Sequence, residues 1–195
     1  MQYPLTLNFK KIAFAKQATL TDASSKPIAY ARQKILKLKE ELEIFEDKTK
    51  AKKVCSIKAN KVLDFRAAYS FTDLNERPFG SIKREGLRSI WKATYLLNDS
   101  DNNHYATIRE ENPFAKVVDT LLGSIVGVGL IVNYIFNPSY IITTEKGKEL
   151  FRITKEPSFW GGLFKIEKLS EIDDSEEIRC LMATFMMIFL EKSRG

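Results

Sequence analysis

The chain has 195 residues, of which 44% are hydrophobic and 29% are charged, and its formal net charge is +6. These values are typical of a soluble globular chain that is long enough to build one sizeable domain. The first nine residues contain no basic start followed by an apolar block, so we expect no secretory signal there.

The positive charge is concentrated in the first part of the chain. Residues 1–112 contain 21 Lys and Arg against 14 Asp and Glu, whereas residues 113–195 contain 10 against 11. A basic first part is suited to the phosphate groups of lipid or nucleic acid. Scattered lysines of an ordinary basic protein would give the same count, so both interpretations stay open.

Two cysteines, Cys55 and Cys180, fall within apolar patterns. This placement is typical of buried free thiols in a reducing compartment rather than of a disulfide framework. We therefore expect a cytoplasmic protein, with peripheral attachment to a membrane as an option.

The first predicted element covers residues 5–15, whose partial alternation of apolar and polar residues indicates a β-strand. Five similar segments follow, and each consists of a β-prone run, a polar turn and a second β-prone run. They begin at Ala18, Glu43, Tyr69, Tyr95 and Tyr140. Because Asp, Asn, Ser and Gly favour turns while Val, Ile, Phe and Tyr favour strands, these segments predict five antiparallel hairpins.

The repeat extends to single positions. The acids that open the first four turns are 25, 26 and 26 residues apart, namely Asp22, Asp47, Asp73 and Asp99. Apolar residues recur two positions before each turn, at Leu20, Phe45, Phe71, Leu97 and Ile142. Others recur within each return strand, at Ala31, Ile57, Ile82, Ile108 and Ile153. A basic residue follows directly in the first four copies, at Arg32, Lys58, Lys83 and Arg109.

An apolar insert at residues 112–137 separates the fourth and fifth hairpins. Residues 117–136 contain a single charge, Asp119, and hydropathy alone would suggest a transmembrane helix. A transmembrane helix at this point would place hairpins of one sheet on opposite sides of a bilayer. A helical crossover packed on the domain, or a segment at a membrane surface, fits the repeat better.

The last predicted elements are a strand at residues 159–169 and a helix at residues 176–192, with Ser175 as its expected N-cap. The apolar residues of the run 178–190 (IRCLMATFMMIFL) occupy every side of a helical wheel, which indicates a helix that is buried on all sides. At ~1.5 Å per residue this run is about 20 Å long, too short for a bilayer core. Its expected core positions are Ile178, Leu181, Met182, Phe185, Met186, Ile188 and Phe189.

Five hairpins and the two end strands give about twelve strands, and we expect them to close into an antiparallel barrel around the terminal helix. Closure removes exposed sheet edges and creates an enclosed interior in which the all-apolar helix can be buried. The expected fold is therefore mainly β, a single domain over residues 1–195 with one enclosed helix.

No catalytic, metal or cofactor site is evident in the sequence. The one histidine, His104, lies in a predicted turn, and the regularly placed acids are explained by the hairpin repeat. We therefore expect a protein that is not an enzyme and that needs no cofactor.

The repeated basic residues are the main functional candidates, because equivalent positions on four hairpins should meet at one rim of the barrel. Such a rim could bind phosphorylated lipid headgroups or an anionic membrane surface. Alternatively, it is a solvated edge whose lysines prevent sheet-to-sheet aggregation. The predicted anion-binding residues are Arg32, Lys34, Lys58, Lys83, Arg84 and Arg109.

The hairpins with their turn acids (LTDASSKPIAYA and FTDLNERPFGSI) and the terminal run 178–190 resemble the tubby C-terminal-like superfamily, which includes the phospholipid scramblases and the LURF-one-related proteins. The resemblance covers essentially the whole chain and implies a twelve-stranded barrel that encloses a hydrophobic C-terminal helix. Members of this superfamily have been linked to phosphoinositide binding, membrane tethering and lipid scrambling. The chain lacks a residue-level match to a lipid-binding pair and a cysteine-rich palmitoylation cluster, so no site is carried over and scrambling is not expected.

The sequence thus predicts a non-enzymatic module that binds a membrane surface or an anionic, phosphoinositide-like lipid. The alternative is a protein-interaction or regulatory scaffold whose basic face binds a protein or nucleic acid. Of these partners, nucleic acid is the least expected.

Overall fold

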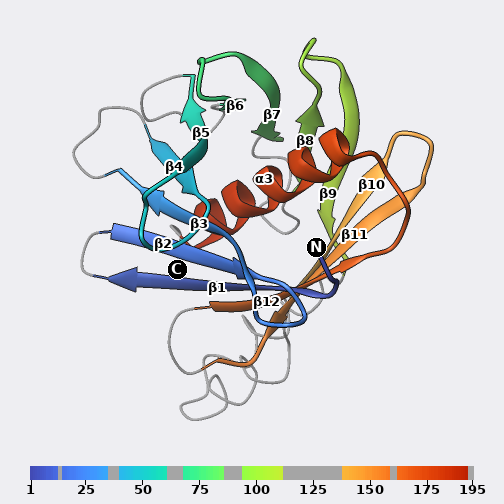
Figure 1. Cartoon of the computed structure of the whole chain (residues 1–195). Helices are drawn as coiled ribbons and strands as arrows, with labels where there is room; N and C mark the ends of the chain where they lie inside the picture. The colour runs from blue at the N-terminus through green and yellow to red at the C-terminus, as the bar shows by residue number, and fades with distance from the viewer. Residues whose placement is uncertain are drawn as a thin grey trace, which may run out of the picture.

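The computed structural model describes residues 1–12, 15–34, 40–60, 68–85, 94–111, 138–158 and 162–192. Within them, twelve antiparallel strands close into a barrel and helix α3 (Asp174–Glu191) crosses the middle of the ring (Figure 1). The predicted mainly β barrel with an enclosed C-terminal helix is confirmed. The strands are β1 (Leu5–Ile12), β2 (Ala15–Thr21), β3 (Pro27–Gln33), β4 (Glu41–Phe45), β5 (Lys53–Ala59), β6 (Ala68–Thr72), β7 (Pro78–Arg84), β8 (Thr94–Asn98), β9 (His104–Glu110), β10 (Ser139–Thr144), β11 (Glu149–Glu156) and β12 (Gly162–Lys168). Each strand pairs with the next in sequence, and β1 closes the ring against β12.

The five predicted hairpins are β2–β3, β4–β5, β6–β7, β8–β9 and β10–β11. Four of their turns close in the same way, with a backbone hydrogen bond between residues four apart, and the β4–β5 turn is longer. In the β6–β7 turn, Asp73 Oδ1 accepts hydrogen bonds from the N–H groups of Asn75 and Arg77, both at 2.8 Å. These bonds satisfy two turn donors, which explains why an aspartate recurs at this place. The residue three positions after the opening residue always has a positive φ, and these residues are Ser25, Lys50, Glu76, Asn102 and Gly147.

A β-bulge follows every turn. In each hairpin the register shifts at the start of the return strand, so that one residue has no partner across the ladder. A bulge bends its strand and increases the local twist, and five bulges at one end of the sheet help it to curl into a ring. The bulged residues are Ile28, Val54, Phe79, Tyr105 and Leu150.

The core is the space between the inner wall and α3. Both predicted sets of repeated apolar positions are buried, and the return-strand set from Ala31 to Ile153 is 0% exposed throughout. The wall meets the helix directly: the ring of Phe9 lies edge-on to that of Phe189, with centroids 5.2 Å apart. A closed wall explains why the helix can be apolar on every side.

The start of α3 differs from the prediction. Asp173, not Ser175, is the N-cap, and its side chain accepts a hydrogen bond of 2.8 Å from the N–H of Glu176. Six of the seven predicted core residues are buried, but Ile178 is 46% exposed, so its assignment to the core was wrong. The first turn of α3 lies at the mouth of the barrel, where the wall does not cover the side on which Ile178 lies.

Polar contacts fix both ends of α3 to the wall. Near its start, Glu177 accepts hydrogen bonds from the Tyr3 hydroxyl at 2.8 Å and from Lys168 Nζ at 2.7 Å. At its end, Glu191 accepts a hydrogen bond of 2.5 Å from the Tyr95 hydroxyl. Because a sliding or rotated helix would lose these bonds, they select one position for an otherwise apolar rod.

The apolar insert at residues 112–137, with Asp119, lies outside the described residues. Its flanks are described: the N–H of Glu111 donates to the carbonyl of Ser139 at 2.8 Å, so the chain leaves β9 and enters β10 at neighbouring points. No helix within the described part of the chain is long and apolar enough to cross a membrane.

Candidate anion-binding site

The repeated basic residues lie on the outer wall near the ends of the return strands. Arg32, Lys58, Lys83 and Arg109 each come one position after a buried core residue, on β3, β5, β7 and β9. Because successive side chains of a strand point to opposite faces, all four point outward. Their strands run in the same direction, so these residues lie toward the end of the barrel opposite the hairpin turns. We call these four residues the basic rim.

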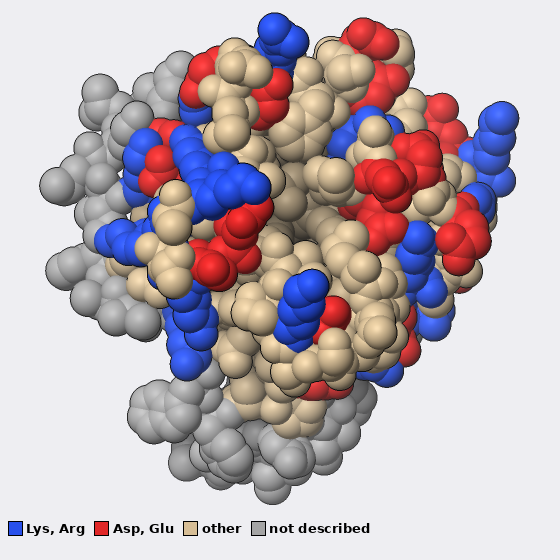
Figure 2. Space-filling view, in the orientation of Figure 1, with Lys and Arg blue, Asp and Glu red and all other residues tan. Residues whose placement is uncertain are grey.

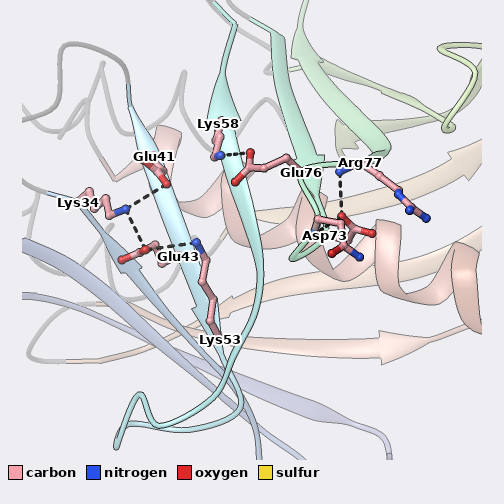
Figure 3. Close-up of polar contacts among 9 residues, drawn as sticks. Lys34, Glu41, Glu43, Lys53, Lys58, Asp73, Glu76 and Arg77 are labelled. Carbon is pink, nitrogen blue, oxygen red and sulfur yellow. Dashed lines mark hydrogen bonds and ion pairs between the residues drawn. The ribbon is translucent and has the colours of Figure 1, made fainter.

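Lys34, a predicted anion-binding residue, belongs to a network of ion pairs. Its Nζ atom lies 3.3 Å from Glu41 Oε1 and 2.9 Å from Glu43 Oε1 (Figure 3). Glu43 Oε1 also lies 3.4 Å from Lys53 Nζ. The hydrogen bond to Glu43 is the main cause that raises the pKa of Lys34. Lys34 therefore stays charged, but its charge is already matched by two carboxylates.

Lys58 is the one rim residue that is paired with an acid of the next hairpin turn. Its partner is Glu76, the positive-φ residue of the β6–β7 turn (Figure 3). The residues at the same place in the turns that follow the other rim residues are Lys50, Asn102 and Gly147. None of these is an acid, and within the described part of the chain Arg32, Lys83 and Arg109 form no ion pair.

Arg84 does not join the rim. It follows Lys83 by one position and so lies on the inner face of β7. Its guanidinium carbon is 5.8 Å from the centre of the Tyr95 ring, a cation–π distance, and its Nη1 atom is buried without a hydrogen-bond partner among the described residues. This side chain faces the interior beside the end of α3.

A groove of about 600 Å³ opens beside Arg109 on the outer wall of β9 and β10. Short side chains such as Thr107, Ile141 and Thr143 line it. At one end His104 is fixed by contacts of both ring nitrogens, Nδ1 with the Leu97 carbonyl at 3.1 Å and Nε2 with the Thr107 hydroxyl at 3.2 Å. Three glutamates, Glu110, Glu111 and Glu145, also line the groove. Its carboxylates therefore outnumber its one cation, Arg109, and the groove by itself does not suit a phosphate group. The sequence did not predict this groove, because residues 112–137 separate β9 from β10 along the chain.

The described part of the chain contains few other reactive or metal-binding groups. Cys55 and Cys180 are buried, and burial raises the pKa of each thiol to about 12. Both are therefore protonated at neutral pH, and a protonated thiol is a poor nucleophile. The described residues contain no group of three or more His, Cys, Asp or Glu side chains that could hold a metal ion.

No protein-family model matches the chain, and no curated protein is similar to it. The resemblance to the tubby-like superfamily therefore stays a prediction. The basic rim is the candidate functional surface, and Arg32, Lys83 and Arg109 are its members without an ion pair in the described part of the chain.

Proposed function

We propose that the basic rim binds the surface of an anionic membrane, with Arg32, Lys83 and Arg109 as its main contacts. The observation that supports this most is their equivalence. They occupy the same position in three hairpins, all on the outer wall near one end of the barrel and all without an ion pair in the described part. Lys58 adds less because Glu76 balances its charge.

The expected binding is weak and salt-sensitive. A basic residue near an anionic bilayer contributes about 1 kcal/mol, so three residues give about 3 kcal/mol, or roughly a hundredfold in affinity. At 0.1 M salt, charges on an exposed rim are screened beyond ~10 Å, so the rim attracts a membrane only at close range. Binding should therefore weaken as the salt concentration rises.

The place of the insert along the chain also supports the proposal. The chain leaves the barrel after Glu111 and returns before Ser139, directly after the strand that carries Arg109. Residues 117–136 contain a single charge, Asp119, and a sequence of this composition suits a bilayer surface. The resemblance to tubby-like proteins points to phosphoinositides as a lipid class to include among the candidates.

Vesicle flotation at low salt tests this proposal. Wild-type protein should float with phosphatidylcholine vesicles that contain phosphatidylserine or a phosphoinositide, and should not float with phosphatidylcholine alone. The rim variant R32E/K83E/R109E should lose binding roughly a hundredfold or more. The control K26E/R77E/K146E changes the net charge equally at exposed turn residues and should keep most of the binding.

Three results would contradict the proposal: no flotation of wild-type protein with any anionic vesicle, unchanged binding of the rim variant, or equal losses in the rim and control variants. Equal losses would mean that net charge, not the rim, governs binding. Tighter and steeply salt-dependent binding to DNA or RNA would favour the alternative of a nucleic-acid partner.

A further inference from the structure

The opposite end of the barrel, formed by the hairpin turns and the first turn of α3, exposes large apolar side chains. Ile178 is 46% exposed and Val54, the bulged residue of β5, is 45% exposed. One turn after Ile178, the sulfur of Met182 lies 3.4 Å from that of Cys55, the neighbour of Val54. Ile178 therefore lies on the side of α3 that faces β5, near Val54. We call this end of the barrel the turn mouth.

Acidic residues gather on one side of the turn mouth. They are Glu171, Asp173, Asp174 and Glu176, in the segment that leads into α3 and in its first turn. This segment is attached to the β10–β11 hairpin. Lys148 Nζ donates to the carbonyl of Glu171 at 2.7 Å, and the Ser170 hydroxyl donates to the carbonyl of Glu149 at 2.6 Å.

Exposed lysines lie on the opposite side. The β4–β5 turn carries Lys48, Lys50 and Lys52 beside Glu46 and Asp47. Lys52 pairs with Glu46 at 2.6 Å, so Lys48 and Lys50 give the turn its net positive charge. In the closed ring of twelve strands β5 is six places from β11, so this turn lies across the mouth from the acidic segment. Figure 2 shows a hollow lined mostly by uncharged residues, with Lys and Arg beside Asp and Glu at its left edge and mostly Asp and Glu at its right edge.

We propose that the turn mouth binds a second copy of this chain through a twofold axis. In such a contact the same surface meets itself after half a turn. The lysine turn of each copy would then face the acidic segment of the other, and Ile178 and Val54 would lie near the axis. A partner with one dominant charge would be repelled by one side of the mouth, whereas a second copy matches both sides.

The available area is sufficient for a stable contact. Twelve strands ~4.8 Å apart and tilted by ~40° form a ring about 24 Å across. With the turns and side chains included, the face covers roughly 900 Å², close to the ~800 Å² that a standard interface takes from each partner. Lys58 reaches the turn mouth through its pair with Glu76, but Arg32, Lys83 and Arg109 lie on the outer wall toward the other end of the barrel. This inference therefore does not depend on the proposed membrane binding.

Sedimentation of the full chain at low salt tests the dimer, and we expect a concentration-dependent equilibrium between monomer and dimer. Ile178→Asp should weaken the dimer at least about tenfold, because it places a charge at the centre of the contact. Ile141→Asp is the control, since Ile141 lies on the outer wall between Arg109 and Arg152. A wild-type chain that remains monomeric at about 0.5 mM would overturn the proposal, as would equal effects of the two substitutions.

Charge reversal gives a second test that does not depend on Ile178. K48E/K50E makes both sides of the mouth acidic, and E171K/D174K/E176K leaves three lysines against Asp173 and so makes both sides basic, so each variant alone should be monomeric. Lys50→Glu suits the positive φ at that position, because Glu76 occupies the same place in the next hairpin. Mixed together, the two variants should form a heterodimer. A mixture that stays monomeric, or single variants that dimerise like the wild type, would overturn the twofold arrangement.

Discussion

Replacing Phe185 with alanine should lower the stability of the whole barrel, because this side chain is 0% exposed in the middle of α3. The change removes an aromatic ring that the wall surrounds and leaves a cavity that the closed ring cannot easily fill. A buried Phe→Ala substitution typically costs ~3–5 kcal/mol. The free energy of unfolding of a domain is about 5–15 kcal/mol, so the variant should still fold but should have a much lower free energy of unfolding.

The assay is unfolding by urea and by heat, followed by circular dichroism. For a chain of this size about 1 kcal/mol corresponds to ~2–4 °C in Tm, so we expect a fall of roughly 6–20 °C. Ile178→Ala is the matched control on the same helix. Its side chain is 46% exposed, and a cost below about 1 kcal/mol is expected. A small effect of Phe185→Ala, or equal effects of the two changes, would refute the central role of α3.

Two further predictions concern ionisable groups. Hydrogen bonds within the turns lower the pKa values of Asp22, Asp47 and Asp99. Their stabilising contribution is therefore present above the unfolded pKa of about 4 and is lost as the pH falls through the lower folded values. The Tm should drop between about pH 5 and pH 2, with a smaller drop in Asp99→Asn, and a constant Tm over that range would contradict this. Cys55 and Cys180 should react with a thiol reagent only as fast as the protein unfolds, because burial raises the pKa of both thiols, and faster reaction would contradict their placement.

The hairpins were predictable because a local rule determines them. An aspartate that accepts bonds from N–H groups two and four positions later needs no information from the rest of the chain, as Asp73 illustrates with Asn75 and Arg77. The bulges were not predicted. An unpaired residue such as Ile28 is defined by its register against the partner strand, and the β-prone sequence around it looks like an ordinary strand start.

The basic rim was predictable only in part. Alternation along β7 places Arg84 on the face opposite Lys83, and this signal was present in the sequence. The pairing of Lys58 with Glu76 depends on how far neighbouring hairpins are staggered in the closed ring, which the order of residues does not reveal. The exposure of Ile178 has the same origin, because it depends on how far the wall extends along α3.

Stability and surface chemistry are separated in this barrel by the alternation of its strands. Residues such as Ile82 and Ile108 face α3, where packing limits what can replace them, while Lys83 and Arg109, one position later, face solvent. Substitutions on the outer wall and at the turn mouth should therefore change binding or self-association with little effect on Tm. Loss of vesicle binding without loss of stability in the rim variant would assign the effect to charge at the surface, and a parallel loss of both would assign it to the fold.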